Sequence, residues 1–249
     1  LRYLKKRKII LLEDVCESHG AKHKSKKLGT LGLVSNFSFY YAHHMSTIEG
    51  GMICTNSKDA NNFIRCIRSH GLLREIDDAK FRNSYFNKYK DLNSKFIFPY
   101  QGFNVRNTEI GAILGISQLK RLNQNIKLRN RNNEYFLKNI NKNIFFVDFD
   151  MRGSSNYAFN LILNKKNKKL FYKICNSLTK NNIEYRVGSV GGGNQLRQPY
   201  LKNILKKTKA IDFPNTEHMH FYSCYIGNYP DLSLHAVKRL VDIINRSVC

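Results

Sequence analysis

EDVCESHGAKHKSKKLGTLGLVSNFSFYYAHHMSTIEGGMICTN, at residues 13–56, decides the fold. The stretch begins inside the run KIILLEDV (8–15), whose apolar residues end in two acids, as in a buried parallel strand with polar residues at its carboxyl end. Two further β-like runs, 34–42 and 50–56, flank the segment HHMSTIEGG. Open α/β sheets bind ligands at the carboxyl ends of their strands. Asp14 therefore stands where a ligand is expected, although an Asp after a strand is more often a cap or turn residue.

Helical patterns alternate with these strands. Residues 59–71 have helical spacing and end at a glycine, as a C-cap would, and residues 107–140 form one long helical segment. Between them, residues 74–101 are polar and aromatic with no clear period, so a long loop is expected. Alternating strands and helices predict an α/β domain with a largely parallel sheet.

The pattern changes near residue 144. NIFFVDF, YAFNLIL and IEYRVG predict strands, KKLFYKICNSLTKNN predicts an amphipathic helix and SLHAVKRLVDIINRS a closing helix. We therefore expect residues 1–144 to be the C-terminal portion of a larger domain and residues 145–249 to be a small α+β domain. The chain is predicted to begin inside the larger domain, because its first residues, LRYLKKRK, are typical of a helix end and no start methionine is present.

The composition is strongly basic. The chain has 42 Lys and Arg against 18 Asp and Glu, a formal charge of +24, which brings nucleic-acid binding into consideration. The basic residues are spread along the chain among many Asn and Ile, whereas a nucleic-acid footprint would gather them on one face. Lysines on solvated faces are therefore expected, and no nucleic-acid partner is predicted. The positive field also suits an anionic nucleotide-sugar.

Membrane and metal partners are not predicted either. No segment approaches the ~18 apolar residues of a membrane span. The six cysteines form no CxxC pair that would indicate a zinc or redox site. A chain of this length needs no disulfides to fold, so reduced thiols and a cytoplasmic location are expected.

Residues 13–56 resemble a family of sugar enzymes. Typical members of the DegT/DnrJ/EryC1/StrS family carry an acid pair followed by HGA, a GxxG, FSFxxxK and a GEGG-like turn. The matches are Glu13-Asp14, His19-Gly20-Ala21, Gly29 and Gly32, Phe37-Ser38-Phe39, and Glu49-Gly50-Gly51. GFNVRNTEIGAILGISQL (102–119) resembles the family's helix entry, and the resemblance covers essentially the whole chain. It implies a type I PLP-dependent aminotransferase fold, N-terminally truncated, with a partial large domain and a small C-terminal domain.

The resemblance implies a site for pyridoxal phosphate (PLP) or pyridoxamine phosphate (PMP). Asp14 would pair with the pyridine nitrogen, which lets the ring act as an electron sink. Ser38 would bind the cofactor phosphate; the alternative is a buried strand hydroxyl bonded to backbone. Glu17 stands where many relatives have a Gln near the cofactor's phenolic oxygen, a departure that leaves its role open. Asn104 would reach the phosphate of the partner subunit's cofactor, which implies a homodimer with shared active sites.

His43 is the decisive departure from the family's aminotransferases. It stands where they place the lysine that binds the cofactor covalently. An imidazole cannot make that bond, but it can move protons near neutral pH. YAHHMSTIEGG resembles the branch that removes the C3 hydroxyl from 4-keto-6-deoxy nucleotide-sugars with PMP, for the deoxysugars of lipopolysaccharide O-antigens. His43 is therefore expected to be the acid and base, with L-glutamate as amino donor. The alternative for two adjacent histidines is a surface loop.

Two kinds of enzyme carry out this dehydration. One acts on CDP-sugars with a [2Fe–2S] cluster, which needs four suitably placed thiolates. Its compact cysteine group follows the segment matching RSHG, whereas residues 69–85 contain no cysteine here. Cys16 lies near a ligand position, but a lone buried thiol is usually packing. The cluster-free kind, resembling GDP-4-keto-6-deoxy-D-mannose 3-dehydratase, is therefore favoured, with a GDP-sugar as substrate.

The segment IEYRVGSVGGGNQLRQPYLK (183–202) supports this branch. Its GGGN-x-x-RQPY pattern resembles the dehydratases, and glycines let backbone approach a ligand closely. Arg186 and Arg197 are candidates for contacts to the nucleotide-sugar, and Glu184 for orienting the substrate or His43. A structural salt bridge is an equally good interpretation of each.

The sequence thus predicts a PLP/PMP-dependent nucleotide-sugar 3-dehydratase, a lyase. One rival is an ordinary nucleotide-sugar aminotransferase. His43 argues against it, because such an enzyme would have a lysine at this position. The other is a non-catalytic remnant or basic binding module that kept the fold. The joint presence of Asp14, Ser38 and His43 argues against that module, and charge gathered on one face away from the pocket would favour it.

Overall fold

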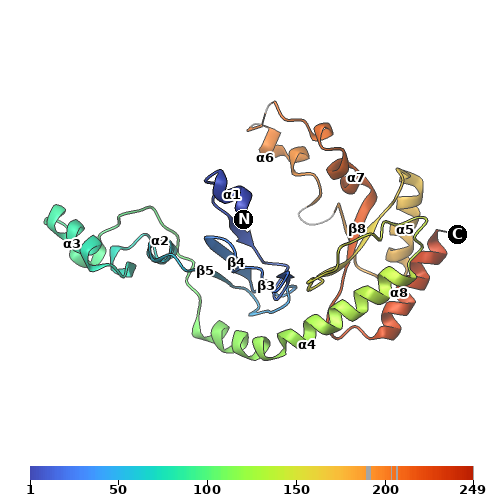
Figure 1. Ribbon diagram of the computed structural model, residues 1–249, viewed down its shortest axis with the longest axis horizontal. Helices are drawn as coiled ribbons and strands as arrows, with labels where there is room; N and C mark the ends of the chain where they lie inside the picture. The colour runs from blue at the N-terminus through green and yellow to red at the C-terminus, as the bar shows by residue number, and fades with distance from the viewer. Residues whose placement is uncertain (189–191, 203, 206, 249) are drawn as a thin grey trace. The chain divides into compact units, whose positions relative to one another are not determined.

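The computed structural model describes residues 1–188, 192–202, 204–205 and 207–248, and these fall into two compact units, Leu1–Leu122 and Asn123–Cys249 (Figure 1). Helices and strands occur in both, so the prediction of a mixed α/β fold is confirmed. The domain boundary between residues 144 and 145 stays a prediction.

The first unit contains, among its described residues, a three-stranded sheet of order β1-β4-β5. The strands are β1 (Leu12–Asp14), β4 (Val34–Ser38) and β5 (Gly51–Thr55). β1 runs parallel to β4, whereas β5 runs antiparallel to it. The sheet here is therefore mixed, where a largely parallel one was expected. The reason is the connection of residues 39–50, which turns the chain back so that β5 returns beside β4 in the opposite direction.

Helices and short turns complete this unit. They are α1 (Arg2–Lys6), the strand pair β2 (Lys22–His23) and β3 (Lys26–Lys27), α2 (Lys58–Arg68), η1 (Leu73–Glu75), α3 (Ala79–Lys88), η2 (Ser94–Phe96) and the first part of α4 (Glu109–Asn139). None of the helices in the described ranges is both long and apolar enough to cross a bilayer.

Helix α3 lies within the segment 74–101 that the sequence predicted as a loop, and that prediction is wrong here. Asp78 caps the helix by accepting the N–H of Phe81 at 3.0 Å. Phe81 and Tyr85, one turn apart, then pack on a small buried cluster of the same unit. The Asp cap and the aromatic pair at helical spacing were the local signals of this helix.

The second unit is an antiparallel sheet with helices against it. Its elements are the rest of α4, β6 (Ala158–Ile162), α5 (Lys168–Lys180), β7 (Arg186–Val187), η4 (Gln195–Arg197), α6 (Pro199–Lys202), η5 (Ala210–Asp212), α7 (Pro214–Tyr222), β8 (Ser223–Gly227) and α8 (Leu234–Ser247). In the described residues the sheet order is β6-β8-β7, so β8 is central. The strand expected at 143–149 is reduced to a single bridge between Phe145 and Leu163.

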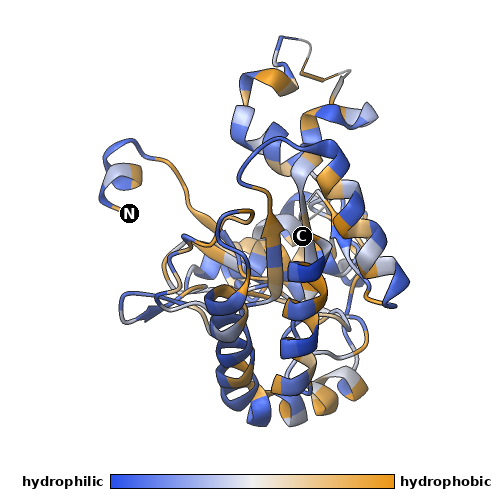
Figure 2. Ribbon diagram, turned by 90° about the vertical axis from the view of Figure 1, so that its right-hand side faces the viewer, coloured by the Kyte–Doolittle hydropathy of each residue, from blue (hydrophilic) through white to orange (hydrophobic). Residues whose placement is uncertain are grey.

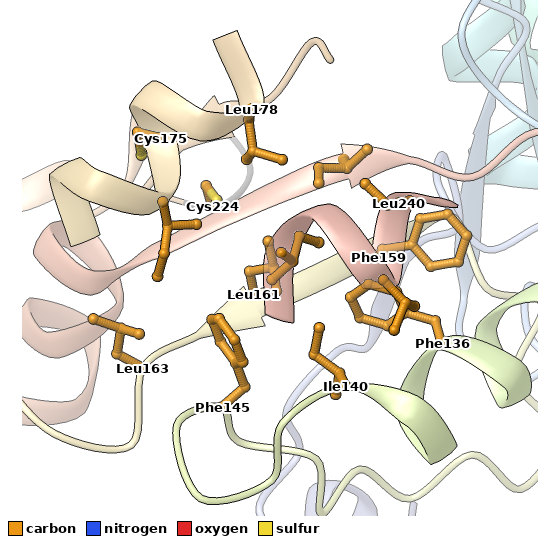
Figure 3. Packing of buried hydrophobic residues seen from close by; sticks show 14 of the residues in the cluster. Phe136, Ile140, Phe145, Phe159, Leu161, Leu163, Cys175, Leu178, Cys224 and Leu240 are labelled. Atoms are coloured by element: carbon orange, nitrogen blue, oxygen red, sulfur yellow. The ribbon is translucent and has the colours of Figure 1, made fainter. Parts of the chain in front are cut away.

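The core of this unit lies where α4, α5 and α8 meet the sheet (Figure 3). Phe136 of α4 is fully buried and stacks on Phe159 of β6, with ring centroids 4.8 Å apart. The buried residues of α8 recur at helical spacing: Val237, Leu240, Val241 and Ile244. Figure 2 shows hydrophobic and hydrophilic residues succeeding one another along this C-terminal helix, as its amphipathic pattern predicts.

Candidate functional site

Asp14, the last residue of β1, carries an exposed carboxylate that is held by its neighbours. Its Oδ1 accepts the backbone N–H of Cys16 at 3.1 Å and the side-chain amide of Asn36 at 3.0 Å. Asn36 is the register partner of Asp14 on the parallel strand β4, so strand pairing itself brings the amide to the acid. The Cys16 side chain, the Cys16 N–H, the Asn36 amide and the charge of His43 together lower the pKa of Asp14 against partial burial. An ionised acceptor therefore stands at the carboxyl end of a strand.

Glu13, the other acid of the pair, holds the neighbouring glycine loop. Its Oε1 accepts the backbone N–H groups of Leu31 and Gly32, both at 2.7 Å, and its Oε2 accepts that of Gly29 at 2.8 Å. Burial would raise the pKa of Glu13, but these three donors lower it. A Cβ at residue 32 would lie 2.6 Å from the carbonyl oxygen of Leu11, so a glycine is required there. The Glu13 carboxylate thus has a structural role, in which it holds the backbone of residues 29–32.

Ser38 ends β4, next to β1. Its Oγ accepts the N–H of Tyr40 at 3.3 Å, and the Ser38 backbone forms a hydrogen bond with His19. Because β1 and β4 are parallel, the ends of both strands lie at one edge of the sheet. The two residues predicted to bind opposite ends of the cofactor, Asp14 and Ser38, are thus both at this edge.

His43 lies in the turn after β4 and approaches Glu17, which lies in the turn after β1. The distance between His43 Nε2 and Glu17 Oε1 is 3.8 Å, with side chains 12% and 32% exposed. The ring of Tyr40 stands edge-on to His43, with centroids 5.5 Å apart. His43, predicted as catalytic, and Glu17, predicted as cofactor-binding, therefore lie side by side, a proximity that the sequence analysis missed.

Two further histidines are buried beside this turn. The rings of His19 and His44 stack with centroids 5.6 Å apart, and these residues are only 2% and 3% exposed. Burial, followed by the charge of His43, lowers the pKa of His19 to about 4, so His19 is neutral at physiological pH. Phe37 and Phe39 contact its ring edge-on. Of the two adjacent histidines, His43 thus faces the Glu17 carboxylate, whereas His44 is buried in the interior.

Asn104 is exposed and pairs with Ser69 through an isolated backbone bridge. Its Oδ1 accepts a hydrogen bond from Arg106 Nε at 3.3 Å. The role expected for Asn104, toward a partner subunit's cofactor, stays a prediction.

The substrate candidates belong to the second unit, and Arg197 there forms a bidentate ion pair. Its Nε and Nη2 donate to Oε1 and Oε2 of Glu217 at 2.8 and 2.5 Å, and its guanidinium stacks over Phe221 at 4.6 Å. Asn194 adds a hydrogen bond to Glu217 at 2.8 Å. The salt bridge that the sequence allowed for is thus formed, and it fastens the segment around Arg197 to helix α7.

Arg186 and Glu184 lie at the short strand β7 of the same unit. Arg186 donates to the hydroxyl of Tyr225 at 3.4 Å. This hydrogen bond, followed by the charge interaction with Tyr225, raises the pKa of Arg186. Glu184 is exposed. Their roles toward a substrate stay predictions, and residues 189–191 of the glycine motif lie outside the described residues.

The pair of Arg197 and Glu217 gives the protein a pH-dependent contribution to stability. The guanidinium, with help from Asn194, lowers the pKa of Glu217 from 4.5 to about 2. The stabilisation is therefore present above pH ~4.5 and is lost as the pH falls toward ~2. It is at most about 1 kcal/mol, because Arg197 is 42% exposed. In urea unfolding at a series of pH values, Glu217→Gln is expected to flatten this acid-side loss. Equal pH dependence in both proteins would contradict the assignment.

Among the described residues, no group of three or more His, Cys, Asp or Glu side chains is placed to hold a metal ion. The expectation that no iron–sulfur cluster is bound stays a prediction.

The chain is similar in sequence and in fold to several known proteins. GDP-4-keto-6-deoxy-D-mannose 3-dehydratase of Escherichia coli O55:H7 is 32% identical over 234 residues, covering 90% of this chain and 57% of the relative. A solved E. coli enzyme of that activity with bound hydrated PLP has a TM-score of 0.81 at 31% identity, over 98% of this chain and 62% of that one. A further solved 3-dehydratase, holding a trapped PLP-glutamate geminal diamine, has a TM-score of 0.79 at 31% identity and the same coverage.

The chain therefore spans about three fifths of the length of these relatives. The similarity to PLP-containing structures confirms the PLP-dependent aminotransferase fold predicted from the sequence. The model of one family matches residues 1–245, nearly the whole chain. The chain belongs to the DegT/DnrJ/EryC1/StrS aminotransferase family.

Proposed function

We propose that the protein is a cytoplasmic PLP/PMP-dependent 3-dehydratase that removes the C3 hydroxyl of a GDP-linked 4-keto-6-deoxy sugar. L-glutamate would be the amino donor, and the product a deoxysugar precursor for lipopolysaccharide O-antigen. The observation that carries the proposal is His43, which stands where the family's aminotransferases have a lysine and lies 3.8 Å from the Glu17 carboxylate. Relatives named for this activity, at 31–32% identity, support it.

The residues at the sheet edge fit the cofactor. Asp14 is an ionised acceptor for a pyridinium N–H, because its neighbours lower its pKa. Ser38 Oγ already accepts a backbone N–H, so its own O–H is the donor that a phosphate oxygen needs. Glu17 would lie close to the cofactor's phenolic oxygen. Once bound, the cofactor supplies an amine for the sugar's ketone and a ring that delocalises negative charge.

His43 would do the proton transfers. Its Nε2 takes a proton from carbon during the reaction and delivers one to the C3 hydroxyl as that group departs. The Glu17 carboxylate favours the imidazolium form that exists between these two steps, because an opposite charge stabilises it. A lysine would instead bond the cofactor covalently, and the sugar would gain an amine.

A product analysis tests the function. Protein loaded with PLP is given L-glutamate and GDP-4-keto-6-deoxy-D-mannose. The expected products are ammonia and a 3-deoxy-4-keto sugar, with about one ammonia per sugar consumed, followed by NMR and an ammonia assay. Formation of a stable 4-amino sugar without ammonia would contradict the proposal and support the aminotransferase rival.

Shared active sites are tested by subunit mixing. We expect a homodimer in which Asn104 of one protomer serves the site that contains Asp14 of the other. Two inactive variants, Asp14→Asn and Asn104→Ala, should together regain up to roughly a quarter of native activity, because one of the two sites in each hybrid has both residues intact. The measurement is turnover after subunit exchange, verified by mass spectrometry. No recovery in verified hybrids would contradict the shared site.

A further inference from the structure

We infer that Asn36 and Cys16 are positioning residues for Asp14, which orient its carboxylate at the sheet edge. The inference rests on the proposed function, in which Asp14 binds the cofactor's pyridine nitrogen. Its geometric part, a hydrogen-bonded triangle of the three residues Asp14, Cys16 and Asn36, stands independently of any cofactor and is tested separately.

The triangle consists of three hydrogen bonds. The Nδ2 of Asn36 donates to Asp14 Oδ1 at 3.0 Å and to Cys16 Sγ at 3.1 Å. The backbone N–H of Cys16 donates to the same Asp14 oxygen at 3.1 Å. A primary amide has two N–H donors, so one Asn36 side chain can serve both partners at once. The carboxylate is thereby fixed from two directions.

The backbone makes this arrangement a rigid one. Asn36 is the middle residue of β4, which is paired on both sides, with β1 and with β5. Its partner across the parallel ladder is Asp14 itself. An amide presented from a central strand is located more firmly than one on a loop. Asn36 therefore orients Asp14 from a part of the fold that has little freedom.

Cys16 contributes a neutral donor. Burial, followed by the hydrogen bond to Asp14 and its negative charge, raises the pKa of the Cys16 thiol to about 11. The thiol thus stays protonated at neutral pH and hydrogen-bonds to the carboxylate, where a thiolate would repel it. The Cys16 side chain is also the largest cause of the lowered pKa of Asp14. This cysteine, which the sequence suggested was packing, is therefore part of the site's hydrogen-bond network.

Two charged side chains outside the triangle also act on its groups. Glu17, after β1, raises the pKa of Cys16, and His43, after β4, lowers that of Asp14. Variants at Asn36 and Cys16 leave both of these groups in place.

Thiol reactivity tests the triangle without a cofactor. The rate of Cys16 modification by a disulfide reagent is measured at pH 8 by peptide mass spectrometry, with the similarly half-buried Cys54 as internal reference. Asp14→Asn removes the charge that disfavours the thiolate, so Cys16 should react about 10-fold faster. Asn36→Leu removes a donor that favours the thiolate, so Cys16 should react several-fold more slowly. A merely loosened segment would react faster in both variants, and that result, or no change in either, would overturn the inference.

Cofactor binding tests the consequence. In the holoprotein, Asn36→Leu and Cys16→Ala should each weaken PLP binding by roughly 10-fold, the low end for a hydrogen bond to a charged group. Cys16→Ser, which keeps a donor, should stay within about 3-fold of native, and Asn83→Leu on the exposed face of α3 is the control. ¹⁵N NMR of labelled PLP reports whether the pyridine nitrogen is protonated.

The two readouts separate the possible failures. Opposite-sign thiol effects combined with a loss of pyridine protonation in Asn36→Leu support the inference. Opposite-sign thiol effects with native affinity and protonation in every variant, Asp14→Asn included, leave the triangle intact and refute the proposed role of Asp14. If Asp14→Asn loses the cofactor while Asn36→Leu and Cys16→Ala bind it normally, positioning by Asn36 and Cys16 is refuted and the proposed function stands.

Discussion

We expect the replacement of His43 by Asn to lower the rate of single-turnover dehydration by ~10²–10⁴-fold or more, while cofactor binding stays close to native. General acid–base groups typically contribute this much, and His43 would serve more than one proton transfer. Cofactor binding should persist because Asp14 and Ser38 are unchanged. Asn retains polarity and approximate size in a side-chain position that is only 12% exposed, so the fold should also persist.

The measurement uses PMP-loaded protein mixed rapidly with a 4-keto-6-deoxy GDP-sugar, with the cofactor absorbance followed over time. His23→Asn, at an exposed position of β2, is the matched control and should react at the native rate. A near-native rate for His43→Asn would remove this residue from the mechanism. The main reason for preferring dehydration to transamination would be lost with it.

Phe136→Ala should destabilise the second unit by about 3–5 kcal/mol, the usual cost of deleting a buried aromatic ring. Phe136 is completely buried and stacks on Phe159 at 4.8 Å between ring centroids, so its removal leaves a cavity that the sheet and helices cannot close without moving (Figure 3). The mutation lies in the second unit and changes no residue of the sheet edge that carries Asp14.

Urea unfolding followed by circular dichroism measures this loss. Phe146→Ala, at a phenylalanine that is 41% exposed, is the matched control and should cost less than about 1.5 kcal/mol. Equal losses for the two variants would mean that Phe136 does not anchor the core of this unit.

Periodic patterns in the sequence predicted most of the elements that bury one face. Helix α8 has apolar residues at helical spacing, and β4 and β5 lie within the runs predicted as strands. Strand β8 was missed although four of its five residues are buried, because its apolar run follows helix α7 without a break. The antiparallel course of β5 could not be predicted either, since a short connection fixes it and no single-strand pattern records direction.

The sequence indicated three candidate site residues, but it did not indicate the neighbouring side chains that contact them. Asp14, Ser38 and His43 were proposed from family motifs, and the structure places the first two at the ends of β1 and β4 and the third in the turn after β4. Their supporting neighbours depend on strand register, which a linear pattern does not contain. Asn36 acts on Asp14 only because β1 and β4 pair in that register, and Glu17 meets His43 only because two turns emerge from adjacent strands.

The loop held by Glu13 has a consequence for where phosphate can bind. Three converging backbone N–H groups, from Gly29, Leu31 and Gly32, form the kind of concave nest that captures phosphate or sulfate in many proteins. Here the bound anion is the Glu13 carboxylate of the same chain. It accepts all three N–H groups, which are therefore not available to an ion from solution. A glycine-rich motif in this position is therefore not a phosphate-binding loop. Under the proposed function, the cofactor's phosphate would therefore need donors other than these three N–H groups, such as the hydroxyl of Ser38 at the sheet edge.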